Sequence, residues 1–183
     1  MKNLINILGI LLFVFLIISC GNESTNDNQQ VNQLVKENTN NIQIIETLKK
    51  KSLFYAKAEE FEYLTDKNSE FLNITKIVFS FIMPTNADSP IICKEVLKFI
   101  GEEKVVFSSS EEYALIEEEE LREYRMMQKG TIEINDNTYS GTLYYNDRSN
   151  DNKVGFDGKL IFELPAIKSL EGESVTIEIK GKK

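Results

Sequence analysis

The most regular pattern in this chain is the alternation of apolar and polar residues near its C-terminus. In residues 174–180, valine and isoleucine alternate with polar residues, and this period of two predicts a strand with one buried face. Residues 71–83 are rich in β-branched and aromatic side chains instead, which predicts a long, largely buried strand. Further strands are predicted at Lys104–Ser108, Thr131–Asn135, Thr138–Tyr145 and Val154–Leu164. Asp136-Asn137 predicts a tight turn that joins two of them.

Three other segments carry helical features. Ser110–Gln128 is the strongest candidate, because Ser110 can cap a helix and acidic residues follow it in the first turn, where the helix dipole favours them. A strand over Tyr113–Ile116 remains an alternative. Ile42–Lys51 predicts a short helix from its spacing of apolar residues. Cys93–Ile100 fits either a strand or a helix.

Many short strands, few helices and no strand–helix–strand rhythm together predict a fold class. We expect a mainly β domain, an antiparallel β-sandwich or a barrel-like domain with one or two short helices. This single globular domain is expected to span residues 42–183.

The N-terminus has the pattern of a targeting signal. Met1-Lys2-Asn3 is followed by an apolar run that is uninterrupted from Ile10 to Ile18. Nine residues suit the apolar region of a signal peptide and fall short of the roughly 20 that a membrane-spanning helix needs. Residues 1–19 are therefore predicted to be a lipoprotein signal peptide. The alternative is an anchor that keeps its apolar run and leaves Cys20 unmodified.

The signal is predicted to end at a lipid attachment site. Ile17-Ile18-Ser19-Cys20 has apolar residues, then a small residue, then cysteine, as a bacterial lipobox does. The Cys20 thiol would accept diacylglycerol, and two or three acyl chains on it would give stable membrane anchoring. Residues 20–41 are predicted to be the lipidated cysteine and a disordered tether, since residues 21–41 hold seven Asn and few apolar residues.

Composition excludes several classes of function. The 183 residues include no His, which rules out a Ser-His-Asp triad, a His-paired thiol and an imidazole metal site. A net charge of −8 argues against nucleic-acid binding, which needs a positive surface for phosphate. No cofactor, no metal ion and no catalytic residue is predicted.

Three groups of residues have side chains that could form a chemical site. Cys93 follows Ile91 and Ile92, and the chain has no His to act as its base, so a buried core thiol is favoured over a reactive or intermolecular one. Residues 146–152, with Asp157, offer oxygen ligands but lack the spacing of a calcium loop, so a solvated hairpin loop is favoured. Glu117–Glu120 is read as an exposed acidic face, with the binding of a basic partner as the alternative.

The lipobox, the Asn-rich tether and the abundance of Lys, Ile, Asn and Glu resemble the surface lipoproteins of spirochaetes, particularly those of the Lyme-disease group. The resemblance covers the first forty residues and the general composition. It implies outer-membrane anchoring through Cys20 and display at the cell surface, where many such lipoproteins are antigens and some bind host proteins.

Three functions follow as hypotheses. The leading one is a non-enzymatic, lipid-anchored outer-surface lipoprotein of antigen or adhesin type, with the membrane and a host or envelope protein as partners. The second is a periplasm-facing lipoprotein with a structural or envelope-assembly role. The third is a hydrolase that uses two carboxylates within about 10 Å of each other in a concave pocket.

Overall fold

The structure is a computed structural model that describes residue 43 and residues 45–64, 70–117 and 123–183. Residues Ile45–Lys183 form one compact unit. Its elements are β1 (Phe54–Leu64), β2 (Asn73–Phe79), α3 (Pro90–Ile100), β3 (Val105–Ser108), β4 (Ala114–Leu115), β5 (Met126–Ile134), β6 (Asn137–Asp147), β7 (Gly155–Glu163), the 3-10 helix η2 (Lys168–Leu170) and β8 (Ser174–Lys182). The mainly β fold with short helices is confirmed.

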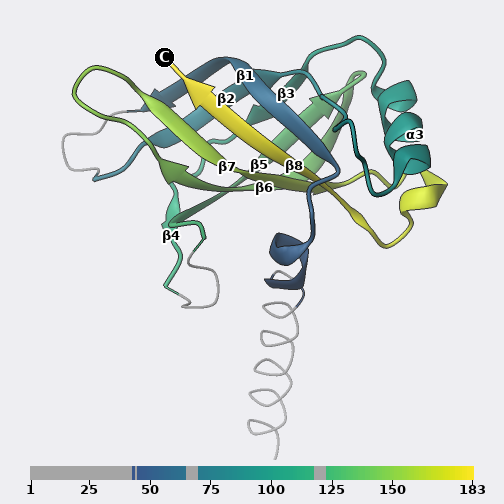
Figure 1. Cartoon of the computed structure of the whole chain (residues 1–183). Helices are drawn as coiled ribbons and strands as arrows, with labels where there is room; N and C mark the ends of the chain where they lie inside the picture. The colour runs from purple at the N-terminus through teal and green to yellow at the C-terminus, as the bar shows by residue number, and fades with distance from the viewer. Residues whose placement is uncertain (1–42, 44, 65–69, 118–122) are drawn as a thin grey trace, which may run out of the picture. The chain divides into compact units, whose positions relative to one another are not determined.

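Seven strands close into a barrel (Figure 1). The strand order is β3-β2-β1-β8-β7-β6-β5, and β3 pairs with β5 to complete the ring. Neighbouring strands of the ring are antiparallel except β1 and β8, which run parallel. The short strand β4 is an addition beside β5, outside the ring. Of the two predicted architectures, the barrel-like one is therefore correct.

Glycines on the inward-facing positions allow the strands to bend into a closed ring. A Cβ on Gly130 would meet the Phe107 ring at 2.7 Å, and one on Gly158 would lie 2.8 Å from the Cβ of Tyr145. Both contacts are closer than real Cβ atoms tolerate, so neighbouring aromatic residues occupy the space that a side chain would need. Interior glycines of this kind mark the tight bends of a barrel.

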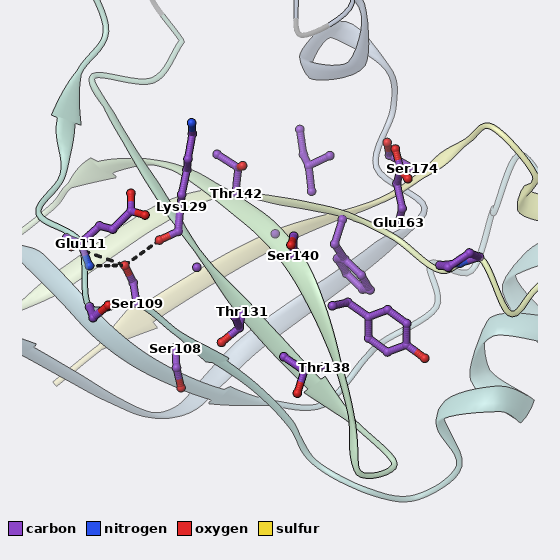
Figure 2. A pocket seen from close by; sticks show the side chains of 17 residues that line it. Ser108, Ser109, Glu111, Lys129, Thr131, Thr138, Ser140, Thr142, Glu163 and Ser174 are labelled. Carbon is purple, nitrogen blue, oxygen red and sulfur yellow. Dashed lines mark hydrogen bonds between the residues drawn. The ribbon is translucent and has the colours of Figure 1, made fainter.

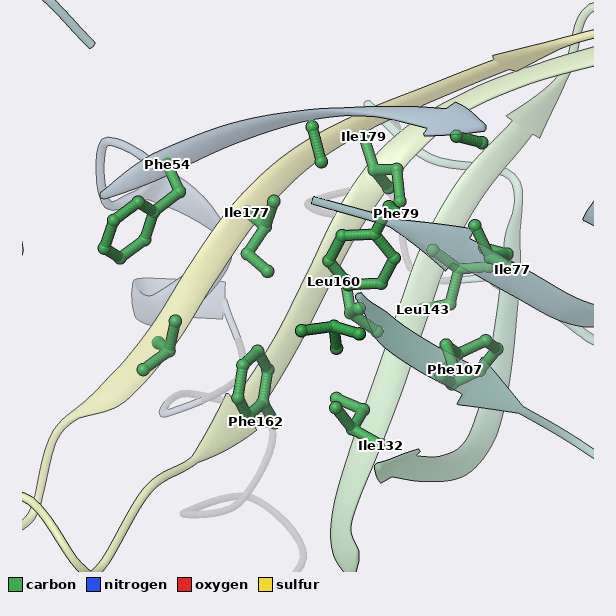
Figure 3. Close-up of a cluster of buried hydrophobic side chains, with 14 of the residues drawn as sticks. Phe54, Ile77, Phe79, Phe107, Ile132, Leu143, Leu160, Phe162, Ile177 and Ile179 are labelled. Atoms are coloured by element: carbon green, nitrogen blue, oxygen red, sulfur yellow. The ribbon is translucent and has the colours of Figure 1, made fainter. Parts of the chain in front are cut away.

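The interior of the barrel is filled by apolar side chains from all seven strands, as Figure 3 shows. The labelled members include Phe54, Phe79, Phe107, Leu160 and Ile177, none of which is exposed to solvent. Ring pairs such as Phe61 and Phe156, with centroids 5.3 Å apart in an edge-to-face arrangement, add to this packing. The described interior is thus a packed apolar core.

One end of the barrel is covered by α3, with η2 beside it (Figure 1). Pro90 starts α3 at a position where a missing N–H costs nothing, and this resolves the open choice at Cys93–Ile100 in favour of a helix. The Ser169 hydroxyl of η2 donates a hydrogen bond to the Glu95 carboxylate of α3. The Asn135 side chain in the β5–β6 turn donates to the Phe99 carbonyl.

A buried polar network lies between β2, β5 and β6. The Gln128 amide donates to the Asn73 side-chain oxygen and to the Glu111 carbonyl, both at 2.7 Å. The Tyr145 hydroxyl donates to the Leu72 carbonyl at 2.7 Å. Burial raises the pKa of Tyr145 well above its usual value.

The helix predicted at Ser110–Gln128 is wrong. The described parts of this segment instead form β4 and the start of β5, with the Ile116 N–H donating to the Arg125 carbonyl as in a hairpin. The strand alternative at Tyr113–Ile116 is confirmed, since β4 lies within it. The physical reason is that Met126 and Gln128 point into the barrel, which a helix would not allow.

Two further differences from the sequence-based expectations concern β1 and a turn. The sequence does not predict a strand at β1, because it holds three glutamates and its alternation breaks at a register shift between Ala58 and Glu60. The turn after β5 is centred on Asn135 and Asp136, which both have positive φ, one residue earlier than predicted. Two positive φ angles are the mark of a type I′ hairpin turn.

The N-terminal side of the compact unit is held on the outer wall of the barrel. Residues 45–49 are helical, within the short helix predicted at Ile42–Lys51. The Lys159 ammonium of β7 donates to the Leu48 carbonyl at 2.6 Å and to the Lys50 carbonyl at 3.0 Å. A cation there satisfies carbonyls left open at a helix C-terminus. Within the described residues, no helix is long and apolar enough to cross a membrane.

Candidate functional site

The outer wall of the barrel carries a groove of about 1060 Å³ (Figure 2). Its floor comes from β3, β5, β6 and β7. Ser108 of β3 lies opposite Thr131 of β5, and Thr131 lies opposite Ser140 of β6. Thr142 follows on β6, opposite Lys129 of β5. We call this surface the hydroxyl groove.

Side-chain size explains why the wall is hollow here. Residues that face outward on neighbouring strands stand side by side in register. Ser108, Thr131 and Ser140 are small, so this row lies lower than the longer side chains of Lys129 and Glu163. Sheet pairing thus converts small residues on three strands into one continuous depression.

The hydroxyl groups of the groove are available to a ligand. Ser108, Thr131, Ser140 and Thr142 form no side-chain hydrogen bond with any residue that the structure describes. Ser109 differs, since its hydroxyl donates to the Lys129 carbonyl at 2.6 Å and is buried. A hydroxyl both donates and accepts hydrogen bonds. The groove therefore suits a polar partner that also carries both donors and acceptors.

Charged side chains stand at the margins of the groove. Figure 2 shows Glu111 and Lys129 toward one end and Glu163 toward the other, with hydroxyl groups between them. Half-buried Tyr139 also lines it. This arrangement offers charge of both signs, with the carboxylates of Glu111 and Glu163 toward opposite ends of the groove.

Cys93 lies in the core, as its apolar neighbours in the sequence predict. It is fully buried on α3, and its thiol donates to the Leu53 carbonyl at 3.5 Å. Burial raises the pKa of the Cys93 thiol. A thiol with a raised pKa is a poor nucleophile, because the thiolate is the reactive form. The prediction of a buried core thiol is confirmed.

Residues 148–152 of the oxygen-rich segment lie in the exposed β6–β7 hairpin loop, as predicted, whereas Asn146 and Asp147 belong to β6 and Asn146 is buried. The Asp147 carboxylate accepts the Leu72 N–H at 2.9 Å and the Ser149 N–H at 2.7 Å. Asp157 forms an ion pair with Arg148. These carboxylates are therefore occupied in shaping the loop, and in the described chain no three His, Cys, Asp or Glu residues gather as a metal site would require.

Two predicted features fall largely outside the described residues. Cys20, the signal peptide at 1–19 and the tether at 20–41 lie in the part of the chain that the structure does not describe. The same holds for Glu118–Glu120 of the acidic run, while Glu117 is exposed just after β4.

The hydroxyl groove was not predicted from the sequence. Its residues occupy the polar positions of predicted strands, so the pattern that could have revealed them is the recurrence of serine and threonine on the outward faces of 104–108, 131–135 and 138–145. That signal is visible only once the strand order and register are known. Comparisons of the chain with protein-family models, with curated proteins and with solved structures found no match.

Proposed function

We propose that this chain is a lipid-anchored bacterial outer-surface lipoprotein. It is non-enzymatic in this proposal and resembles the surface lipoproteins of spirochaetes. Its barrel presents the hydroxyl groove to a host or envelope protein. The observation that carries the proposal is the position of Cys20, directly after Ser19 and an apolar run of signal-peptide length.

The barrel supports a role in contact with a partner. Because apolar side chains fill its described interior, a ligand has to bind on the outer wall. The hydroxyl groove is a hollow on that wall with side chains left free to bond. Unpaired polar groups around a concave surface are the usual basis of specificity in a binding site.

Acylation of Cys20 is tested directly. Cells that express the chain are labelled with radioactive palmitate, and the protein is isolated with and without globomycin, which blocks lipoprotein signal peptidase. We expect label in the wild type and in Cys93→Ala, no label in Cys20→Ala, and a larger precursor with globomycin. Wild-type protein without label would refute the anchor.

Display at the surface is tested by protease treatment of intact cells. Degradation of the wild-type protein supports surface display, with a periplasmic protein followed as the control for envelope integrity. Complete protection would instead assign the protein to the periplasmic face, as in the envelope-assembly alternative.

The groove is tested by filling it. Ser140→Trp places a bulky ring in the floor of the groove, whereas Asn152→Trp places one on the exposed β6–β7 hairpin as a control. We expect binding of serum, matrix or envelope proteins to be lost with Ser140→Trp alone. Equal binding by both variants would show that the groove is not the binding site.

A further inference from the structure

A second surface lies on the outer wall where β1 and β8 run parallel. Lys57 of β1 stands directly opposite Lys180 of β8, and Lys182 follows on the same strand. Arg148 lines the same hollow. We call Lys57, Lys180 and Lys182 the lysine seam.

The lysine seam carries an excess of positive charge, since four basic side chains (Lys57, Arg148, Lys180 and Lys182) line its hollow against two carboxylates (Asp157 and Glu178). Asp157, opposite Lys180 on β7, forms its ion pair with Arg148. Lys57, Lys180 and Lys182 form no salt bridge with any residue that the structure describes. Like charges opposite each other in a sheet are destabilising, so Lys57 and Lys180 favour an anion at this surface, although the whole chain has a net charge of −8.

Exposed apolar side chains lie beside these cations. Tyr55 is 39% exposed and Ile82 is 54% exposed, the latter among the most exposed large apolar residues described. Two backbone hydrogen bonds, of 2.9 and 2.8 Å, join these two residues, which are therefore neighbours on the wall. Together with the lysines they line a hollow of about 770 Å³. Exposed aromatic and aliphatic groups beside basic side chains are typical of a surface that binds at a membrane interface.

The position of the N-terminal segment favours the same wall. Tyr55 lies opposite Glu178, and Glu178 lies opposite Lys159, so all three belong to one outward row. Lys159 holds the carbonyls of Leu48 and Lys50 against the barrel. The described segment around Leu48 and Lys50 therefore contacts the outer wall at β7, the strand beside β8.

We propose that the lysine seam, with Tyr55 and Ile82, docks the barrel wall on anionic lipid headgroups. This inference rests on the proposed function only in that the N-terminus holds the chain at a membrane. Tyr55 and Ile82 enter the interface, and the three ammonium groups contact lipid phosphates. A lysine close to an anionic membrane strengthens association roughly fivefold, so three of them strengthen it roughly a hundredfold.

The absence of tryptophan makes docking measurable in the full chain. Ile82→Trp introduces a single tryptophan within the docking surface, and Leu115→Trp introduces one on exposed β4, beside β5. In the ring of strands, β5 is three steps from both β1 and β8. Each variant is reconstituted in phosphatidylcholine vesicles with about 30% phosphatidylglycerol, an anionic lipid, with and without brominated acyl chains. Tyr55→Trp replaces Ile82→Trp if that variant does not fold.

We expect brominated lipid to quench Ile82→Trp and to leave Leu115→Trp unchanged. Adding Lys57→Gln and Lys180→Gln should lower the docking equilibrium constant roughly 25-fold, whereas Lys129→Gln in the hydroxyl groove should not change it. High salt, or vesicles of phosphatidylcholine alone, should also abolish quenching.

Equal quenching of the two tryptophans would overturn lipid docking. Quenching of Ile82→Trp that is unchanged by the lysine substitutions would overturn it as well. No quenching, together with seam-dependent binding of polyglutamate, would overturn it too and assign the seam to acidic protein segments. Acylation is scored by mass on the same preparations. A chain without acyl groups would refute the proposed anchor. If its apolar N-terminus still holds that chain in the vesicles, the quenching experiment still tests docking.

Discussion

Tyr145→Phe removes one hydroxyl from the buried polar network without changing the shape of the core. In the folded chain that hydroxyl donates to the Leu72 carbonyl at 2.7 Å and lies 3.4 Å from the Gln128 side-chain oxygen. The residue is fully buried. The Phe variant therefore leaves a buried carbonyl without its donor, in a place where the ring itself still fits.

The cost follows from that unpaired carbonyl. Leaving a buried acceptor unsatisfied costs about 1–3 kcal/mol, and the packing of the ring is unchanged. We expect the free energy of unfolding at pH 7 to fall by about 2 kcal/mol. Tyr55→Phe, on the exposed wall, is the matched control and should change it by less than about 0.5 kcal/mol.

The same variant should change the response to alkaline pH. Burial raises the pKa of Tyr145 in the folded chain, while the unfolded chain releases the phenol proton near pH 10. Above pH 10 the unfolded state is therefore favoured increasingly, by up to about 1.4 kcal/mol per pH unit for this residue. Burial raises the pKa of Tyr124 likewise, so Tyr145→Phe should reduce the alkaline loss of stability without removing it.

Urea unfolding followed by far-UV circular dichroism measures both effects, at pH 7 and at half-unit steps from about pH 9.5 to 11.5. A Tyr145→Phe chain that is as stable as wild type at pH 7 would refute the cost assigned to the unpaired carbonyl. An unchanged alkaline slope would refute the claim that burial controls the ionisation of this phenol.

Three further predictions concern the core and the wall. Gly158→Ala should lower the free energy of unfolding by about 3 kcal/mol or more, because its Cβ would collide with the Tyr144 carbonyl; a urea midpoint equal to that of wild type would contradict the tight bend. In a Cys20→Ala chain, Cys93 should react with a thiol reagent only in unfolding concentrations of urea, since the native side chain is 0% exposed; fast native-state labelling followed by absorbance would contradict this. Lys104→Met should raise the pKa of Glu59, which the 2.6 Å ion pair lowers in the native chain. The stabilisation from Glu59 is present above the unfolded pKa of glutamate and is lost as pH falls through the lower folded pKa. An NMR titration that gives Glu59 the same pKa in both chains would contradict the effect of Lys104.

Sequence periodicity predicted most strands but not all of β5. Residues 131–135 fit the pattern because Ile132 and Ile134 face the core, whereas the inward positions before them are Gln128 and Gly130. Neither residue has an apolar side chain, so the alternation of apolar and polar residues does not extend to them. Gln128 is buried because its partners from β2 and from the Glu111 carbonyl satisfy it, and those partners are distant in sequence.

The sequence by itself determined the β class, the type I′ turn region, the burial of Cys93 and the absence of any histidine chemistry, because each depends on local pattern or on composition. It also carries the prediction of an anchor at Cys20, which stays a prediction. Tertiary structure alone decided that the sheet closes, and that Ser108, Thr131 and Ser140 share one groove while Lys57 meets Lys180. Those neighbours come from strand register, where a slip of one residue would turn every side chain to the opposite face.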